Sequence, residues 1–314
     1  MPPKTLVIPG PPPSGKTRLA VELALRHGGE VVSADSMQVY RRMDIGTAKP
    51  TPEEMRGIPH HMLDVADPEE DFSVARYVEL AAPCVDDILA RGKLPIVAGG
   101  TGLYLDSLLS GRTFAPFSPD GGLRARLEAR FDALGGEAML GELAAADPEA
   151  AARLHPNDRK RIVRALEVFQ QTGKTISQHN RETRALPLRY DALTLSLAFQ
   201  RREDMWARID RRVDEMMAAG LAEEVRALLD SGVPVRCTAM QAIGYKEMAA
   251  ALRGGGDVCA AAEEIKLRSR QYAKRQLTWF RRTEGAKWLF WGPEPDFEAA
   301  CRTSTKYLEE FGLV

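Results

Sequence analysis

The sequence lacks the marks of a secreted, membrane-spanning or disulfide-stapled protein. No apolar run approaches the roughly 20 residues needed to cross a bilayer, and the N-terminus has neither the apolar core of a signal peptide nor an arginine-rich transit pattern. The 4 cysteines are scattered, with no C-x-x-C pair and no histidine at zinc spacing. We therefore expect a cytoplasmic chain without a membrane partner, a disulfide framework or a structural metal, and with its cysteines as core thiols.

A large net charge is also missing. The 43 lysines and arginines nearly balance the 44 aspartates and glutamates, so the formal net charge is −1. A nucleic-acid partner would therefore have to be bound by a local basic surface. With 314 residues, the chain is long enough for one large domain carrying an insertion or for two domains. We expect a monomer and identify no protein partner.

The most specific motif follows a short β-prone run at residues 5–8. Residues 10–17 read GPPPSGKT and fit G-x-x-x-x-G-K-[ST], with apolar residues at helical spacing after them. Such a loop is typical of nucleotide-binding and ATP-binding proteins, because its N–H groups and the following helix N-terminus hold phosphates. Three prolines in the loop carry no N–H group. We therefore assign the phosphate site to Gly10, Ser14, Gly15, Lys16 and Thr17, and a Mg²⁺ site to Thr17.

A second buried strand is predicted over residues 30–34, and it leads directly into Asp35-Ser36-Met37-Gln38. In an α/β sheet the carboxyl ends of the strands form the ligand-binding edge. We therefore expect Asp35 beside the phosphate loop, where a carboxylate can act as a base or bind metal. A simple turn-capping role is the alternative.

A third predicted strand, at residues 95–98, ends in Gly99-Gly100. A nucleotide-hydrolysing protein would place an aspartate at such a strand end, to hold Mg²⁺ and its water. Glycines instead allow the close approach of a ligand or of another backbone, and Thr101 adds a hydroxyl at this edge. This pattern indicates a site that holds phosphates without activating water.

The pattern changes to Ala-, Arg- and Glu-rich helical segments in the middle of the chain. We predict an α/β fold, a P-loop-type parallel sheet flanked by helices, with an inserted all-helical subdomain. The first part of the core spans residues 1–115, the insertion 116–187 and the second part of the core 188–314. Within the insertion, a helix from residue 157 carries Lys160, Arg161 and Arg164 on one face. That face suits a phosphate backbone, and a solvated surface is an equal alternative.

Two basic features follow the insertion. Arg202 begins a predicted helix, and arginine binds phosphate in a bidentate manner, so we expect it to be a second cation for a diphosphate. The run from residue 265 to 282 contains no acidic residue. Wound as a helix, it places polar and basic side chains on one side, at positions 268, 271, 274, 275, 278, 281 and 282. Such a stripe is the electrostatic footprint expected for a nucleic-acid backbone.

These residues together resemble the bacterial tRNA dimethylallyltransferase family, also called tRNA isopentenyltransferases, over almost the whole chain. The motifs that carry the resemblance are the phosphate loop and the segments SADSMQVY (33–40), GTAKP (46–50), GGTGLY (99–104), HPND (155–158), IGYK (243–246) and RQYAKRQ (270–276). The family usually has Thr-Ala where this chain has Pro12-Pro13, which removes a hydroxyl from the loop.

The resemblance implies transfer of a dimethylallyl group from dimethylallyl diphosphate to N6 of the adenosine 3′ of a tRNA anticodon. It implies that Lys16, Mg²⁺ at Thr17 and Arg202 stabilise the leaving diphosphate and that Thr101 lies in the reaction channel. It also implies that Asp35 accepts the N6 proton or holds that amine in line for attack. A flipped adenosine would be read by Ser36 and Gln38. The tRNA contacts implied are Asp35, Ser36, Met37, Gln38, Thr101, Arg124, Lys160, Arg161, Arg164, Gln241, Gly244, Tyr245, Lys246, Arg270, Gln271, Lys274, Arg275 and Arg281.

Three other functions remain as alternatives. A P-loop small-molecule kinase shares the fold class, but Gly99-Gly100 and the basic helices argue against it. A prenyltransferase that makes cytokinins from free adenine nucleotides would have little use for the basic helices. A non-enzymatic RNA-binding or switch protein would not need Asp35 beside a phosphate loop.

Overall fold

The computed structural model describes residues 1–112, 114 and 122–314, and its contacts divide the chain into two compact units. One unit contains residues 1–109 and 189–314, and the other contains residues 110–188. The insertion was expected at residues 116–187. Each unit has its own apolar core, so each is described by itself.

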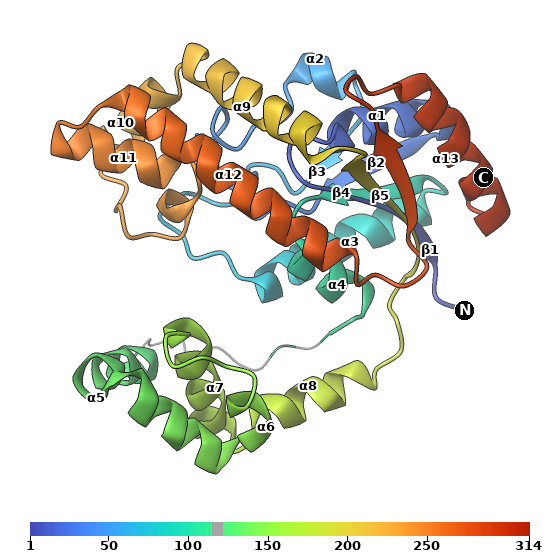
Figure 1. The fold of residues 1–314 in the computed structure, drawn as a ribbon. Helices are drawn as coiled ribbons and strands as arrows, with labels where there is room; N and C mark the ends of the chain where they lie inside the picture. The colour runs from blue at the N-terminus through green and yellow to red at the C-terminus, as the bar shows by residue number, and fades with distance from the viewer. Residues whose placement is uncertain (113, 115–121) are drawn as a thin grey trace. The chain divides into compact units, whose positions relative to one another are not determined.

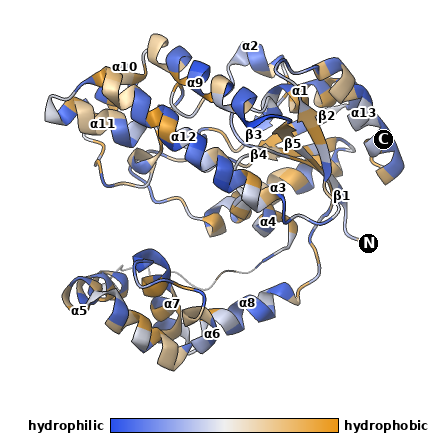
Figure 2. Ribbon diagram, viewed as in Figure 1, coloured by the Kyte–Doolittle hydropathy of each residue, from blue (hydrophilic) through white to orange (hydrophobic). Residues whose placement is uncertain are grey.

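The larger unit is built on a parallel sheet, which confirms the predicted α/β class (Figure 1). Within the described residues the sheet has six strands in the order β3-β2-β4-β1-β5-β6. Their bounds are β1 Lys4–Pro9, β2 Gly29–Ser33, β3 His60–His61, β4 Leu94–Gly99, β5 Asp191–Phe199 and β6 Lys287–Trp291. The central strands are buried along nearly their whole length and appear hydrophobic in Figure 2, as expected of parallel strands covered on both faces.

Helices complete both units. In the larger unit they are α1 Lys16–His27, α2 Pro52–Met55, α3 Val74–Ala90, α4 Gly102–Leu109, α9 Arg202–Ala218, α10 Leu221–Asp230, the short 3₁₀ helix η1 Ala239–Gln241, α11 Tyr245–Gly254, α12 Val258–Phe280 and α13 Phe297–Phe311. In the smaller unit they are α5 Gly122–Ala146, α6 Pro148–Ala151, α7 Arg159–Thr172 and α8 Ile176–Arg184. The described part of the smaller unit contains helices and no strand.

Helix α12 packs against α9 and α11, while α13 packs against α1. The buried side of α12 includes Ile265, Gln276 and Phe280. Among the described residues, no helix is both long and apolar enough to pass through a bilayer.

The expectation of core thiols is wrong for most of the cysteines. All 4 are free, but only Cys301 is buried, whereas Cys84 and Cys237 are half-buried and Cys259 is exposed. Cys84, Cys259 and Cys301 lie on the helices α3, α12 and α13, and Cys237 lies outside the helices, so their burial depends on how these segments pack.

Three basic side chains contact one buried carboxylate, Glu30, near the start of β2. Glu30 is 2% exposed. Both Arg91 nitrogens Nη1 and Nη2 contact it, Lys93 Nζ donates to it at 2.7 Å, and His61 Nε2 lies 2.9 Å from it. These donors, Arg91 above all, hold the pKa of Glu30 well below its usual range.

We predict that Glu30→Gln lowers the free energy of unfolding by about 2 kcal/mol near neutral pH, because three donors lose the buried negative charge that they contact. Since the folded-state pKa is lowered, this stabilisation is present above the unfolded-state pKa of glutamate, about 4.3, and is lost as the pH falls. Urea unfolding should therefore show the two proteins converging in acid. The control is Glu79→Gln, an exposed position on α3. A stability difference that stays constant down to acid pH would contradict the prediction.

Candidate active site

Three segments meet at the carboxyl edge of the sheet. The phosphate loop follows β1, Asp35 follows β2 and Thr101 follows β4, which lies between the other two strands. Ala34 N donates to Ala98 O at 2.8 Å, and Thr101 N donates to Ala34 O at 3.1 Å. Backbone hydrogen bonds therefore fix the segment before Asp35 against the end of β4.

The phosphate loop borders a cavity of about 190 Å³. Ser14, Gly15, Lys16 and Thr17 line it, and Gly15 has a φ of +76°, a conformation that favours glycine, directly before α1. The N-terminus of α1 thus borders the cavity and offers an anion site. Gly10 does not line it. A Cβ there would lie 2.6 Å from Ser14 Oγ, so this glycine permits close packing within the loop.

The C-terminal part of the chain supports this loop from behind. Trp291 Nε1 donates to Ser14 O at 2.7 Å, and the Phe297 ring packs against Gly15, where a Cβ would approach it to 2.6 Å. The Arg18 guanidinium lies 4.2 Å from the centre of the Phe297 ring. Sequence reasoning missed these contacts, because they join residues nearly the whole chain apart.

Asp35 is held by one of its two carboxylate oxygens. Oδ1 accepts hydrogen bonds from Met37 N at 2.9 Å and Gln38 N at 3.3 Å. Among the described residues, Oδ2 has no hydrogen-bond partner. Thr101 Oγ1 accepts from Ser36 N at 3.0 Å, so it fixes the turn that carries Asp35. The turn-capping alternative and a chemical role are therefore compatible, because each uses a different oxygen.

The glycines at the end of β4, Gly99 and Gly100, allow close packing. A Cβ on Gly99 would lie 2.2 Å from Ala34 O, and one on Gly100 would lie 2.5 Å from the Gln276 amide nitrogen. Gln276 Nε2 donates to Gly100 O at 2.7 Å in a buried position. The sequence predicted that these glycines allow the close approach of a ligand or of another backbone. The structure shows the second, because the backbone of Ala34 packs against Gly99. The contact at Gly100 also brings α12 against the strand end.

Two half-buried cations, Lys16 and Arg212, interact electrostatically with Asp35. Burial lowers the pKa of Lys16 to about 8, against the opposing effect of the Asp35 charge. Burial likewise lowers the pKa of Arg212, while Glu54 and Asp35 counteract it. Tyr272 of α12 has its pKa raised to about 12, first by burial and then by the Asp35 charge. Asp35 therefore sits at the centre of the charges around the phosphate loop.

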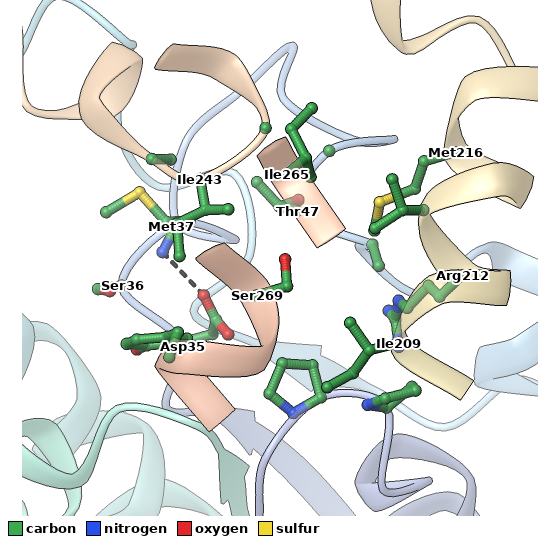
Figure 3. A pocket seen from close by; sticks show the side chains of 18 of the residues that line it. Asp35, Ser36, Met37, Thr47, Ile209, Arg212, Met216, Ile243, Ile265 and Ser269 are labelled. Atoms are coloured by element: carbon green, nitrogen blue, oxygen red, sulfur yellow. Dashed lines mark hydrogen bonds between the residues drawn. The ribbon is translucent and has the colours of Figure 1, made fainter. Parts of the chain in front are cut away.

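A second cavity, of about 380 Å³, adjoins the first, and Asp35 and Arg212 line both (Figure 3). Its polar end contains Asp35 and Ser36. Its walls are largely apolar and come from α9, from the segment before α11 and from α12. The apolar lining residues are Ile209, Val213, Met216, Ile243 and Ile265. Positions 209, 212, 213 and 216 share one face of α9, which is why one helix supplies both the cation and apolar wall.

The structure does not bring Arg202 to the phosphate loop. Arg202 is exposed at the start of α9, its guanidinium lies 4.6 Å from the centre of the Trp206 ring, and it lines neither cavity. Arg212, farther along the same helix, lines both. The position at the helix start directed the expectation to Arg202. Helical spacing places Arg212 on one face of α9 with Ile209 and Val213, but it does not show which cavity that face borders.

Two residues expected to contact RNA are used within the protein. Tyr245 is fully buried, and its hydroxyl donates to Glu224 Oε1 at 2.5 Å, so its side chain is a core group and not a surface contact. Gln38 accepts from Ser33 Oγ at 3.0 Å and donates through Nε2 to the carbonyls of Thr47 and Ala48. Its amide donors are therefore already engaged.

Most of the neighbouring residues that were expected to contact tRNA line a cavity of the site. Ser36, Met37, Gln241 and Gly244 line the 380 Å³ cavity, and Gln241 Nε2 also donates to Val235 O at 2.8 Å. Lys246 is exposed on α11. This segment therefore contributes mainly to the cavity wall.

The stripe on α12 is exposed throughout, as the sequence predicted. Gln271, Lys274 and Arg275 line a shallow hollow of about 420 Å³ with Thr278. Among the described residues, Lys274, Arg275, Arg281 and Arg282 form no ion pair. Arg270 lies off the stripe, and its Nη1 contacts both carboxylate oxygens of Asp210 at 2.6 and 2.7 Å, so it joins α12 to α9.

The basic residues of the smaller unit also gather. Arg124, Lys160, Arg161 and Arg164 line a cavity of about 670 Å³ within that unit. Arg124 and Arg164 contact the same carboxylate of Glu167, at 3.0 and 2.7 Å, and Glu167 is fully buried. Arg161 pairs with Asp158 at 2.6 Å. Sequence spacing predicted the shared face of α7, but not the buried acid beneath it.

Comparison with known proteins gives a consistent result. Residues 38–283 match the family described as IPP transferase, and residues 3–70 match isopentenyl transferase. The chain is 45% identical over 308 residues to the tRNA dimethylallyltransferase of Acetivibrio thermocellus, covering 98% of each chain. It is 50% identical over 289 residues to tRNA dimethylallyltransferase 1 of Trichlorobacter lovleyi, covering 92% of this chain and 94% of that one.

Solved structures agree. The full-length tRNA isopentenylpyrophosphate transferase of Bacillus halodurans has a TM-score of 0.73 and 41% identity, with 98% of this chain and 96% of that one covered. A eukaryotic dimethylallyltransferase acting on tRNA has a TM-score of 0.81 and 30% identity, with 98% of this chain and 78% of that one covered.

We predict that inorganic diphosphate binds more weakly as the pH rises above about 8, because Lys16 then loses its charge. Lys16→Met should weaken binding at pH 7 by about tenfold or more, and should remove this part of the pH dependence. Calorimetric titration at fixed free Mg²⁺ measures both. Since diphosphate itself titrates, the variant supplies the reference profile. Parallel profiles for the two proteins would contradict the assignment to Lys16.

Proposed function

The chain belongs to the tRNA dimethylallyltransferase family, and on that premise we propose that it transfers a dimethylallyl group from dimethylallyl diphosphate to N6 of the adenosine 3′ of a tRNA anticodon. Diphosphate is released. We also propose that the enzyme acts as a cytoplasmic monomer on the anticodon stem-loop.

One observation carries the proposal for the site: Asp35 and Arg212 line both the phosphate-loop cavity and the apolar cavity. A diphosphate suits the first cavity, which is lined by a helix N-terminus and by the half-buried cations Lys16 and Arg212. An apolar prenyl group and a base suit the second, with its apolar walls. The bond that breaks in the reaction joins a diphosphate to an apolar group, so it would lie at the junction of the two cavities, beside Asp35.

The proposed chemical step follows from this arrangement. The N6 amine attacks the first carbon of the dimethylallyl group, the bond from that carbon to the diphosphate oxygen breaks, and the free oxygen Oδ2 of Asp35 accepts the N6 proton. Lys16 and Arg212 stabilise the charge that develops on the leaving diphosphate. Arg212 replaces Arg202 in this role because it lines the cavity. Thr101 positions the turn that carries Asp35.

The residues fit a Mg²⁺ ion that is held mainly by substrate. Within the described parts of the chain, no three His, Cys, Asp or Glu side chains are grouped to bind a metal. Mg²⁺ commonly takes one or two protein ligands together with phosphates and water. Thr17 lines the cavity and would supply a hydroxyl, while the buried Ser14 Oγ, which has no partner among the described residues, remains available to a phosphate oxygen. When bound, Mg²⁺ would neutralise charge on the diphosphate.

The tRNA would be bound by two basic surfaces. One is the exposed stripe on α12, and the other is the face of α7 with Arg124 in the smaller unit. An adenosine stacked in an anticodon loop cannot enter the apolar cavity, so we propose that it is flipped out of the stack. Ser36 and the free acceptor position on Gln38 are the polar groups nearest to Asp35 in sequence that could contact it.

The direct test incubates the enzyme with unmodified tRNA and radiolabelled dimethylallyl diphosphate, with labelled ATP and free AMP as controls. Label should enter RNA from the prenyl donor alone. Transfer to AMP would favour the cytokinin-forming alternative, and phosphate transfer from ATP would favour a kinase.

We predict that Asp35→Asn lowers the transfer rate by at least about 100-fold, because asparagine cannot accept the N6 proton. Asparagine retains Oδ1 as the acceptor for Met37 and Gln38 N–H, so the turn and the tRNA affinity should be preserved. Asp35→Ala removes that acceptor as well and serves as the comparison. Single-turnover kinetics and filter binding separate the two quantities. Full activity of Asp35→Asn would exclude a role as a base.

We predict that tRNA affinity falls steeply with salt, and that Arg275→Ala and Arg281→Ala each reduce the slope of log K against log salt by about 0.7–0.9. Arg270→Ala is the matched control on the same helix, because Arg270 is already paired with Asp210. That variant should leave the slope nearly unchanged. Equal effects for all three arginines would show that the exposed stripe has no special part in binding RNA.

A further inference from the structure

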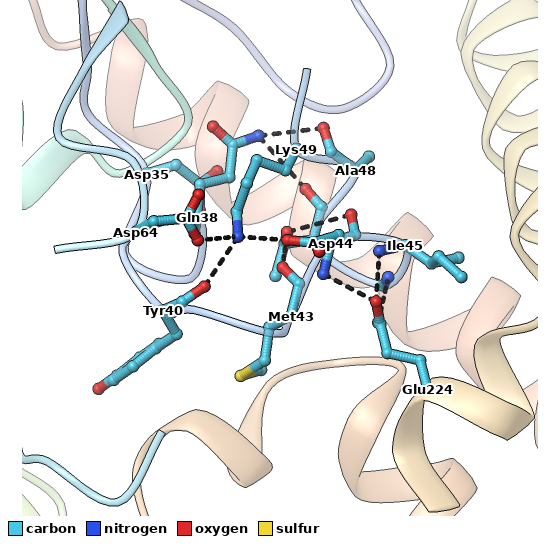
Figure 4. Close-up of polar contacts among 12 residues, drawn as sticks. Asp35, Gln38, Tyr40, Met43, Asp44, Ile45, Ala48, Lys49, Asp64 and Glu224 are labelled. Carbon is cyan, nitrogen blue, oxygen red and sulfur yellow. Dashed lines mark hydrogen bonds and ion pairs between the residues drawn. The ribbon is translucent and has the colours of Figure 1, made fainter. Parts of the chain in front are cut away.

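A single carboxylate from the helical layer anchors a loop of the active site. Glu224 Oε2, on α10, accepts hydrogen bonds from the backbone N–H groups of Asp44 and Ile45, both at 2.8 Å, and Oε1 accepts from Gly46 N at 3.1 Å (Figure 4). Tyr245 at the start of α11 adds its hydroxyl to Oε1. Three consecutive backbone donors pointing at one group form an anion-binding nest, and here the protein's own carboxylate occupies it.

The anchored segment belongs to the walls of the site. Thr47 and Ala48 line both cavities, and Gly46 lines the apolar one. The Tyr245 ring packs so closely on Gly46 that a Cβ there would lie 2.5 Å from it. Glu224 and Tyr245 therefore fix this wall from the α10–α11 side.

The same segment is linked to Asp35. The Gln38 amide donates to Thr47 O at 3.3 Å and to Ala48 O at 3.1 Å, while Gln38 N donates to Asp35 Oδ1 at 3.3 Å. Lys49 holds the far end of the segment, donating to Tyr40 O at 2.8 Å and pairing with Asp44 and Asp64. A continuous set of hydrogen bonds thus runs from Glu224 through residues 44–48 and Gln38 to the carboxylate.

We propose that Glu224 is a positioning residue for prenyl transfer. By accepting the N–H groups of residues 44–46 it places the wall shared by the two cavities, and through Gln38 it orients Asp35 toward their junction. Glu224 itself lines neither of the two cavities. The proposal rests on the function proposed above for Asp35. Transfer activity of the wild-type enzyme is therefore measured in parallel: its absence would refute the proposed function, whereas its presence allows the role of Glu224 to be tested separately.

The physical argument favours charge at this position. A carboxylate can accept all four hydrogen bonds, whereas an amide of the same shape would turn its NH₂ group toward backbone donors. Glu224→Gln therefore breaks the anchor while preserving volume. Glu223→Gln is the matched control, because Glu223 is exposed, lies in the same first turn of α10 and changes the same charge.

The experiment measures kcat and KM for dimethylallyl diphosphate, the Kd for tRNA, the melting temperature and hydrogen exchange of residues 40–50. For Glu224→Gln we expect kcat to fall by about tenfold or more, exchange in residues 40–50 to accelerate, and the tRNA Kd to stay within twofold. Glu223→Gln should match the wild type in all of these. Glu224→Gln combined with Tyr245→Phe should lower kcat no further than Glu224→Gln alone, because both act through one anchor.

Two results would overturn the proposal. One is an unchanged kcat in folded Glu224→Gln, measured well below its melting temperature. The other is a loss of kcat accompanied by an equal loss of tRNA affinity, which would indicate general disruption. If Glu224→Gln fails to fold, Tyr245→Phe is used to test the proposal. This variant removes one of the four hydrogen bonds to Glu224 and leaves the carboxylate in place. A drop in its kcat of about threefold supports the proposal, and no drop refutes it.

Discussion

The parallel pairing of β1 and β2 with the two sides of β4 is the constraint on which the site depends. In parallel strands the carboxyl ends lie at one edge, so three segments far apart in sequence emerge together. The glycines after β4 allow the backbone of Ala34 and the amide of Gln276 to approach closely enough to lock Asp35 and α12 to that edge. The helices then need only supply the cations and the apolar walls.

Burial of charge is the main energetic cost of this arrangement. Desolvation opposes the charged forms of both Lys16 and Arg212. Asp35 offsets it for Lys16, and Glu54 together with Asp35 offsets it for Arg212. A cation that is poorly solvated interacts strongly with an arriving polyanion, because little water has to be displaced. The same arrangement leaves the phosphate-loop cavity lined by charged side chains while the walls of the adjoining cavity are largely apolar.

The sequence predicted the elements that depend on local pattern. The phosphate loop, the placement of Asp35 after a buried strand and the exposed stripe of α12 all follow from short motifs or helical periodicity. It did not predict which side chains would be used inside the protein. Tyr245 stands in a motif of the family and reads as a contact residue, yet its ring fills the core, because its partner Glu224 is supplied by a different helix.

Arg212 is the converse case, a cavity residue that the sequence did not indicate. No motif marks it, and only the packing of α9 against the sheet edge decides that this arginine, and not Arg202, borders the phosphate loop. Arg270 was expected at the RNA surface, but its pairing with Asp210 depends on how α12 crosses α9. Contacts of this kind need the register between elements, which residue patterns within one element do not contain.

The support of Ser14 and Gly15 by Trp291 and Phe297 has a consequence for how the enzyme is made. Trp291 lies 277 residues after Ser14, so the support of the loop is a contact of very high sequence separation. During synthesis the loop leaves the ribosome long before Trp291 and Phe297 do. The phosphate loop therefore reaches its native surroundings only after translation has passed residue 297.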